Sequence, residues 1–200
     1  VVFAHIKPPF QLTLKAALFL FHLMEFLFLD FIQSLRSENL DHFMLFVSSL
    51  GNFGAIWIAL AALLLIIERY RQSGLAVSIA LLIDFVAVNL IIKPLVGRER
   101  PCDVTVPEDM LLACLSDHSF PSGHTAAAFA AAFALFLYHK RAGSAALILA
   151  ILMGFSRLYL FVHFPSDVIA GALLGLCFGF IGYRFAFRRN KKAPNTGNGA

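Results

Sequence analysis

Three polar clusters, each beside a long apolar run, contain the residues of this chain whose types could do chemistry. The clusters are KPLVGRERP from Lys93 to Pro101, FPSGH from Phe120 to His124, and SRLYLFVHFPSD from Ser156 to Asp167. Ionisable side chains at membrane depth are costly and usually serve a function. Together the clusters supply cations, imidazoles and one carboxylate: Lys93, Arg98, Arg100, Arg157, His124, His163 and Asp167.

The cations predict a site for an anion. Three or four positive charges without matching carboxylates nearby attract an anion, and the fork of an arginine suits the oxygens of phosphate. Arg98 is expected instead to anchor the loop at the headgroup surface. Ser122 can cap a helix that begins there, and Gly123 lets the backbone approach a ligand closely. The free N–H groups of that helix start would complete a phosphate cradle.

The histidines predict a nucleophile and an acid. Asp167 follows His163 by four residues, so its carboxylate can hydrogen-bond the imidazole and fix the tautomer. A histidine oriented in this way can act as a nucleophile. His124, in the first turn of the expected helix, could donate a proton to a departing oxygen. With cations holding the remaining oxygens, the chemistry that fits is phosphoryl transfer.

A metal centre fits these residues less well. Two histidines and an aspartate could bind zinc, but the neighbouring cations would repel it. Magnesium prefers several carboxylates. Those of the loop are scattered along the sequence, at Glu99, Asp103, Glu108, Asp109 and Asp117. We therefore expect a site without a metal and a protein without a cofactor.

The rest of the chain must hold these clusters in a membrane. Of its 200 residues, 60% are hydrophobic and only 14% are charged, against about 25% charged residues in soluble domains. Blocks of about 20 apolar residues predict spanning helices. The sequence thus predicts one all-α, polytopic transmembrane bundle over residues 1–190 and a disordered polar tail over 191–200. Five spans are expected, at Phe43–Ile67, Leu75–Leu95, Gly123–Tyr138, Ala145–Val162 and Asp167–Phe187.

A sixth helix is expected at Leu12–Ile32, where the polar residues share one face at 100° per residue. It could cross the bilayer with that face turned inward, or lie in the interface; we favour a span. Within it, His22 and Glu25 are expected to pair with each other or to meet headgroups. In the last span, the repeat of Gly171, Gly175 and Gly179 predicts close packing against another helix.

The basic residues predict the orientation. Most of them fall at one end of the alternating spans, and an excess of Lys and Arg marks the cytoplasmic side. The three polar clusters then face outward, toward the periplasm or the outside of the cell. In that compartment disulfides persist, so Cys102 and Cys114 could be joined across the polar loop, whereas Cys177 is expected to serve packing.

These clusters resemble the signature of the type 2 phosphatidic acid phosphatase superfamily, which also includes vanadium haloperoxidases. That signature is Lys, six residues, Arg-Pro; then Pro-Ser-Gly-His; then Ser-Arg, five residues, His, three residues, Asp. The chain matches it in order and spacing at Lys93, Arg100, Pro101, Pro121, Ser122, Gly123, His124, Ser156, Arg157, His163 and Asp167.

The resemblance implies a role for each of these residues. His163 would be the nucleophile that forms a phosphohistidine, Asp167 would hold and polarise it, and His124 would be the general acid. The phosphoryl oxygens would be bound by Lys93, Arg100, Ser122, Gly123 and Arg157.

The function expected from all of this is hydrolysis of a lipid phosphate or diphosphate at the outer surface of a bacterial inner membrane. Candidate substrates are a polyprenyl diphosphate, phosphatidylglycerol phosphate and phosphatidate, and no nucleic acid is involved. A lipid phosphotransferase on the same scaffold is the first alternative. A flippase or transporter is less favoured, because no inverted repeat or broken helix pair is evident.

Overall fold

The computed structural model describes residues 9–105, 107 and 109–192, and within this part of the chain every regular element is helical. The elements run in the following order along the chain: α1 Pro9–Ser34, α2 Glu38–Leu50, η1 Asn52–Gly54, α3 Ala55–Ile66, η2 Glu68–Tyr70, α4 Arg71–Asp84, the π-helix η3 Phe85–Ile92, α5 Lys93–Val96, α6 Pro101–Val104, α7 Gly123–Tyr138, α8 Lys140–Tyr159 and α9 Pro165–Lys192. The predicted all-α membrane bundle is confirmed.

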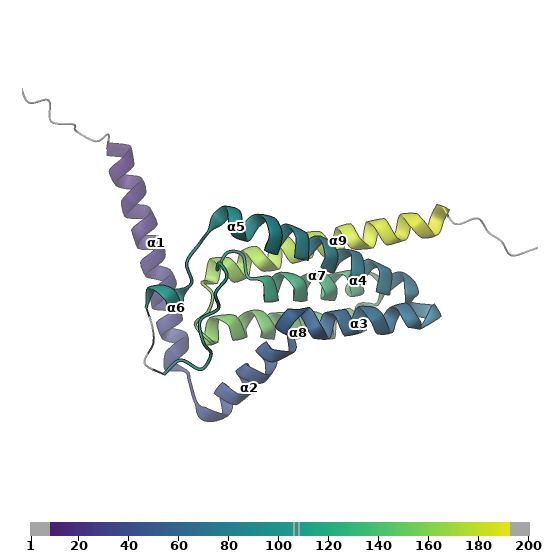
Figure 1. Cartoon of the computed structure of the whole chain (residues 1–200), viewed down its shortest axis with the longest axis horizontal. Coiled ribbons are helices and arrows are strands. Elements are labelled where there is room, and N and C mark those ends of the chain that lie inside the picture. The colour runs from purple at the N-terminus through teal and green to yellow at the C-terminus, as the bar shows by residue number, and fades with distance from the viewer. Residues whose placement is uncertain (1–8, 106, 108, 193–200) are drawn as a thin grey trace, which may run out of the picture.

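Helix α7 lies at the centre of the bundle and packs against α4, α8 and α9 (Figure 1). Its buried side chains are small, six of the eight being alanines. Alanine lets surrounding helices approach closely without the loss of rotamer freedom that larger side chains suffer. A short, alanine-rich helix therefore forms the axis around which the other spans are arranged.

Gly171, Gly175 and Gly179 of α9 pack closely against α7, as their spacing predicts. A Cβ atom at Gly175 would lie 2.4 Å from the carbonyl oxygen of Ala126, and one at Gly171 would lie 2.7 Å from that of Ser122. Only glycine permits this approach. The contact at Gly171 brings the start of α9 against Ser122, at the start of α7.

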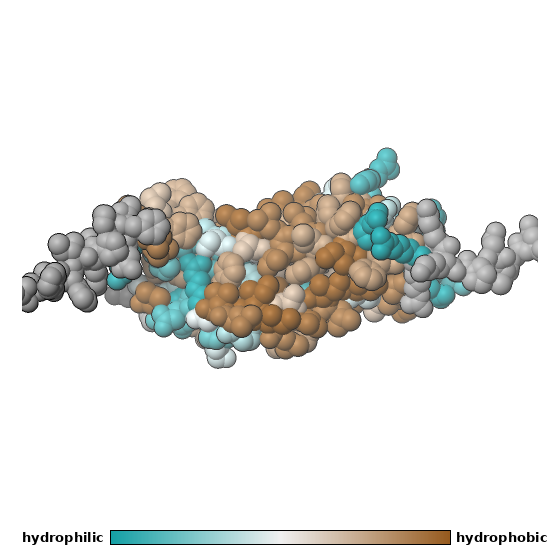
Figure 2. All heavy atoms as spheres, turned by 90° about the horizontal axis from the view of Figure 1, so that it is seen from above, coloured by the Kyte–Doolittle hydropathy of each residue, from teal (hydrophilic) through white to brown (hydrophobic). Residues whose placement is uncertain are grey.

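On the face seen in Figure 2, apolar residues cover the middle of the bundle and hydrophilic residues lie toward both ends. Four helices of the described residues are long and apolar enough to cross a membrane, and a bent pair makes a fifth candidate. The η2 turn, the α7–α8 connection and the end of α9 lie together at one end of the bundle (Figure 1). The three polar clusters lie at the opposite end.

The predicted span Phe43–Ile67 is broken. Helices α2 and α3 meet at an angle of 47°, and the backbone at Phe53 and Gly54 is left-handed, with φ of 54° and 67°. Glycine adopts such a conformation readily, whereas phenylalanine does so rarely. The break places Asn52 at the end of the bundle that carries the polar clusters.

Among the side chains of helix α1 that the structure describes, the buried ones lie in its second half. Glu25, Leu29 and Ile32 are buried, whereas the apolar side chains from Leu14 to Met24 are largely exposed. By length and composition the segment Leu14–Ser34 could span a membrane. Figure 1 shows its axis at a steep angle to the bundle, across the end that carries the polar clusters. This direction favours the interfacial alternative.

A disulfide joins Cys102 in α6 to Cys114 in the polar loop, and this confirms the pairing that the sequence left open. Cys177 is exposed on α9, so it faces away from the packed interior. Of the predicted polar tail, Lys191 and Lys192 belong to α9, and residues 193–200 lie outside the described part of the chain.

Candidate active site

The candidate site lies where α8 ends, α9 begins and α7 begins. After Tyr159 the chain turns sharply, and Phe161 adopts a left-handed φ of 58°. Such a conformation is costly for a residue other than glycine and persists where the surrounding structure enforces it. The turn directs His163 back into the bundle, where its side chain is 1% exposed.

Asp167 lies behind the His163 imidazole, as the spacing of four residues predicts. Its Oδ2 atom lies 3.6 Å from Nδ1 of His163. The same oxygen accepts hydrogen bonds from the hydroxyl of Ser119, at 2.5 Å, and from the backbone N–H of Phe164, at 2.9 Å. Two fixed donors therefore hold the carboxylate against the ring. Ser119 belongs to no motif recognised in the sequence, and only its burial in the loop reveals it.

Arg100 contacts the other side of the same imidazole. Its Nη1 atom lies 3.1 Å from Nε2 of His163 and donates to the carbonyl oxygen of Val162 at 2.7 Å. A guanidinium can only donate, so Nε2 accepts and the ring proton is on Nδ1, facing Asp167. Burial and the charges of Arg100 and Arg157 outweigh the opposing effect of Asp167 and together lower the pKa of His163 to about 3. The histidine is therefore neutral, with its Nε2 lone pair toward Arg100.

Asp117 is a member of the site that the sequence analysis missed. Its carboxylate forms ion pairs with Lys93 and with Arg100, the latter at 2.6 Å. Burial opposes the charge of Asp117, but the Lys93 ammonium and the Arg100 guanidinium outweigh it and lower the pKa of Asp117 to about 2. The expectation of cations without a nearby carboxylate is therefore wrong. The polar loop folds back on itself and returns one of its scattered acids to these cations.

Arg157 is the least satisfied of the buried cations. Its side chain is 1% exposed, and Nη1 donates to the hydroxyl of Ser48 in α2. Its Nε and Nη2 atoms have no hydrogen-bond partner within the described part of the chain. A buried donor without a partner costs free energy, and more so when it carries charge. Two nitrogens of this guanidinium, Nε and Nη2, therefore have N–H groups available to an anion.

The start of α7 lies beside these cations. The backbone N–H of Ser122 donates to the carbonyl oxygen of Asp167 at 3.0 Å, and its hydroxyl contacts that of Thr125 at 2.9 Å. Ser122 occupies the N-cap position but caps no backbone N–H through its side chain, contrary to our expectation. A Cβ atom at Gly123 would meet nothing closer than the Asn89 side-chain oxygen, at 3.5 Å. Packing therefore leaves room for a side chain at Gly123 and does not by itself require glycine there.

His124 lies on the first turn of α7, close enough for the charges of Arg157, His163, Lys93 and Arg100 to act on it. Its Nε2 atom lies 3.2 Å from the side-chain oxygen of Asn52. Asn52 was hidden inside a predicted span, and only the break between α2 and α3 brings it here. The structure thus gathers the histidines and the phosphate-binding candidates at one end of the bundle.

Arg98 does not anchor the loop at the headgroup surface, and that expectation is wrong. It forms ion pairs with Asp167, at 2.6 Å, and with Glu25 of α1, at 2.5 Å. Glu25 therefore pairs with Arg98 and not with His22. The His22 ring packs against the rings of Phe26 and Phe164. Two buried carboxylates hold this guanidinium inside the protein.

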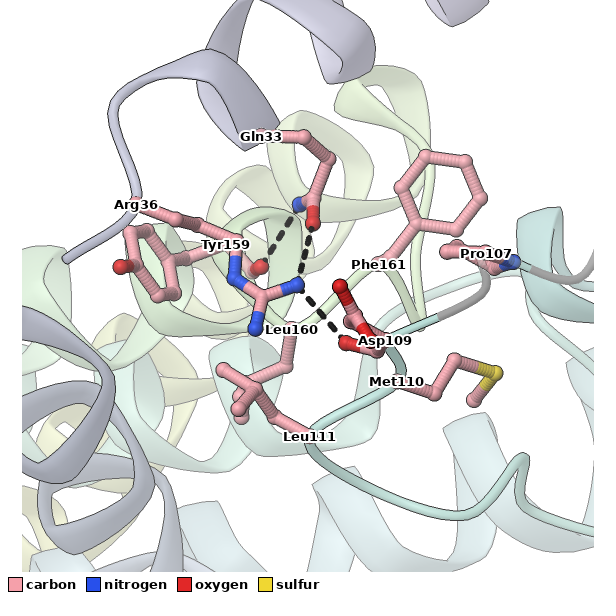
Figure 3. A pocket seen from close by; sticks show the side chains of 9 residues that line it. All are labelled: Gln33, Arg36, Pro107, Asp109, Met110, Leu111, Tyr159, Leu160 and Phe161. Atoms are coloured by element: carbon pink, nitrogen blue, oxygen red, sulfur yellow. Dashed lines mark hydrogen bonds between the residues drawn. The ribbon is translucent and has the colours of Figure 1, made fainter. Parts of the chain in front are cut away.

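Two other clusters are not candidates for the chemistry. Among the described residues, Cys102, Asp103 and Cys114 come together as possible metal ligands, but the two sulfurs are bonded to each other and offer no thiolate. A shallow pocket lies between the end of α1, the polar loop and the turn after α8 (Figure 3), and it includes no predicted site residue. There Gln33 donates to the backbone of Tyr159 and Arg36 to that of Asp109, each at 2.8 Å, so these polar groups satisfy one another.

Comparison with known proteins shows which family the chain belongs to. A model of the PAP2 superfamily matches residues 73–191. The chain is 36% identical to an undecaprenyl-diphosphatase of Sulfolobus acidocaldarius over 144 residues, which are 72% of this chain and 69% of that protein. It is 32% identical to a lipid A 4'-phosphatase of Bacteroides thetaiotaomicron in an alignment of 188 positions. That alignment covers 85% of this chain and 82% of that protein.

The fold agrees as well. The crystal structure of a PAP2-type phosphatidylglycerolphosphate phosphatase from Bacillus subtilis superposes with a TM-score of 0.70 at 25% identity, over 94% of this chain and 96% of that one. The matched family region contains all three polar clusters and the helices that carry them. The chain is a phosphoric ester hydrolase of the membrane, and it belongs to the PAP2 superfamily of lipid phosphatases.

Proposed function

We propose that the protein removes a phosphoryl group from a lipid phosphate or diphosphate through a phosphohistidine at His163, without a metal. The observation that carries the proposal is the buried guanidinium of Arg157, whose Nε and Nη2 atoms have no partner among the described residues. A buried cationic donor without a partner favours an anionic ligand. Lys93, Arg100 and the amide of Gly123 would complete the set of donors for phosphoryl oxygens.

In the first step, Nε2 of His163 attacks phosphorus and the bond from phosphorus to the lipid oxygen breaks. The electron pair of that bond goes to the leaving oxygen, which takes a proton from His124. Attack turns the His163 ring into a cation, and Asp167, already facing Nδ1, stabilises that charge.

In the second step, water attacks the phosphorus of the phosphohistidine. The bond between nitrogen and phosphorus breaks, and its electron pair returns to Nε2. His124, neutral after the first step, accepts the proton of the water. The cycle ends with inorganic phosphate and both histidines in their starting forms.

Among lipid substrates we propose a polyprenyl diphosphate. The undecaprenyl-diphosphatase named among the relatives supports this class. The lipid A and phosphatidylglycerolphosphate phosphatases show how widely headgroups differ among similar proteins. The excess of basic residues at the opposite end of the spans supports a site on the outer face of an inner membrane. We place the whole activity in one domain over residues 1–190.

Phosphate release in detergent tests the proposal. Purified protein with a polyprenyl diphosphate and EDTA should release inorganic phosphate, and His163→Ala and His124→Ala should each abolish the release. His42→Ala, which removes an exposed imidazole from α2, is the matched control and should leave release unchanged. Turnover that survives in both site variants would exclude the assigned roles. Loss of the diphosphate that requires a second lipid, with the phosphoryl group recovered on that lipid and not as inorganic phosphate, would instead indicate a phosphotransferase.

A further inference from the structure

We infer that Arg98 and Glu25 form a positioning pair for Asp167, which makes helix α1 a working part of the active site. The inference rests on the proposed function, because Asp167 matters only if His163 is the nucleophile. Arg98 belongs to none of the signature positions, and Glu25 lies on a helix outside the region that the family model matches. The geometry nevertheless connects both to the carboxylate behind the imidazole.

The contacts form one continuous network. Nη1 of Arg98 donates to Oδ1 of Asp167 at 2.6 Å and to the hydroxyl of Ser166 at 2.7 Å. Its Nη2 donates to Oε2 of Glu25 at 2.5 Å. The other oxygen of Glu25 accepts from the hydroxyl of Ser166 at 2.6 Å. The guanidinium also lies over the ring of Phe164, 4.1 Å from its centroid.

The two oxygens of Asp167 therefore have separate partners. Ser119 and the Phe164 amide hold Oδ2, which faces His163, whereas Arg98 holds Oδ1. A carboxylate held at both oxygens cannot rotate about its last bond, so the oxygen that faces the imidazole keeps its place. Residues of this kind act through the group that they orient.

The charges explain why Glu25 is needed as well as Arg98. A guanidinium that faced Asp167 alone would neutralise it and weaken its attraction for the imidazolium that forms during attack. Glu25 is 4% exposed and shares the same cation. One positive charge between two carboxylates leaves net negative charge behind His163. Arg98 thus orients Asp167 while Glu25 preserves its charge.

A double-mutant cycle tests the pair, with kcat and KM for a polyprenyl diphosphate as readouts. Glu25→Gln keeps the shape and the hydrogen-bond acceptor but removes the charge. It should lower kcat about tenfold, as loss of an outer-shell partner does, and change KM by less than about twofold. In the Arg98→Met background the same change should cost almost nothing, because Glu25 acts through Arg98.

Gln33→Met is the matched control on α1. Gln33 bonds the backbone of Tyr159 and does not contact the network, so its loss loosens the docking of α1 alone. It should cost the same small factor in both backgrounds. Thermal melting in detergent checks that each variant is folded, and if Arg98→Met does not accumulate, the neutral Arg98→Gln takes its place as the background.

Each outcome is decisive. A wild-type kcat for Glu25→Gln, or a loss equal to that of Gln33→Met, would overturn the inference, as would an equal effect of Glu25→Gln in both backgrounds. His163→Ala is assayed beside these variants. If His163→Ala retains turnover, the proposed function fails; if it is inactive while Glu25→Gln is fully active, only the positioning pair fails.

Discussion

Nε2 of His163 lies 3.1 Å from Nη1 of Arg100, so the lone pair of the proposed nucleophile is held by a cation that also binds phosphate in our account. When substrate enters, the phosphoryl group must come between these two atoms. Arg100 then passes from the imidazole to a phosphoryl oxygen, and the lone pair becomes free to attack. His163 thus has a fixed partner on its Nδ1 side, Asp167, and a partner on its Nε2 side, Arg100, that a phosphoryl group can replace.

Asp117→Asn should tighten the binding of phosphate. The Asp117 side chain is 52% exposed although it pairs with both Lys93 and Arg100, so it can turn outward when substrate arrives. Removing its charge leaves two cations to the ligand, and KM and the inhibition constant of inorganic phosphate should each fall roughly tenfold. Glu99→Gln is the control, because it removes an equal charge from an exposed position in the same loop. Unchanged inhibition by phosphate in Asp117→Asn would contradict the competition.

The free energy of unfolding of the protein, measured without phosphate, should depend on pH through His163. Its folded-state pKa of about 3 lies below the ordinary 6.5, so as the pH falls the unfolded chain takes up the proton first. The stability contributed by the neutral ring is present above pH 6.5 and is lost between pH 6.5 and 3. Asp117, with a folded-state pKa of about 2 against an ordinary 3.8, is ionised in both states at pH 5 and above, so its contribution to stability does not change between pH 7 and 5. In phosphate-free detergent, the melting temperature should fall more between pH 7 and 5 for the wild type than for His163→Gln. An equal fall in both proteins would show that the ring is not held neutral.

Gly123→Ala and Gly175→Ala should separate binding from folding. At Gly175 a Cβ atom would lie 2.4 Å from the Ala126 carbonyl oxygen, and the forced shift of α9 should cost roughly 1–3 kcal/mol of stability. At Gly123 the nearest atom is 3.5 Å away, so the variant should melt like the wild type. Its methyl group would block the amide from a phosphoryl oxygen and raise KM roughly tenfold, the loss of one charge-assisted hydrogen bond. A normal KM for Gly123→Ala would remove that amide from the site.

Reduction of the disulfide should loosen the polar loop. The bond between Cys102 and Cys114 spans a sequence separation of 12, and closing a loop of this size stabilises a fold by about 2–4 kcal/mol. The Cys102→Ser/Cys114→Ser protein should therefore melt at a lower temperature and no longer respond to reductant. Cys177→Ser, at an exposed position, should melt like the wild type. A melting temperature that reductant does not change in the wild type would show that the bond contributes nothing.

Much of the site could be predicted from local sequence, because the decisive spacings lie within single turns. His163 and Asp167 are four residues apart at the start of a helix, and the first residues of α7 are fixed by the turn before it. The all-helical membrane fold and the packing of α9 against α7 followed from apolar blocks and glycine spacing. In each of these cases the physical cause acts over a few residues.

The corrections concern contacts that only tertiary structure creates. Asp117 meets Lys93 because a loop folds back, and Arg98 meets Glu25 because α1 crosses the end of the bundle. Asn52 reaches His124 because a kink interrupts the predicted span Phe43–Ile67, at a Gly-Asn-Phe-Gly stretch whose turn-forming residues the span prediction passed over. A charged residue in a loop gives no local sign of the partner that it will find, so its role had to await the fold.

Trapping the phosphoenzyme tests the central claim most directly. Protein mixed with a polyprenyl diphosphate, quenched in alkali within a single turnover and digested, should yield one phosphorylated peptide, modified at His163. His124→Ala should form that species slowly and also lose it slowly, because the variant lacks both the acid of the first step and the base of the second, and Asp167→Asn should form it slowly. Turnover without any phosphorylated histidine, or a phosphoryl group found at His124 instead, would contradict the account.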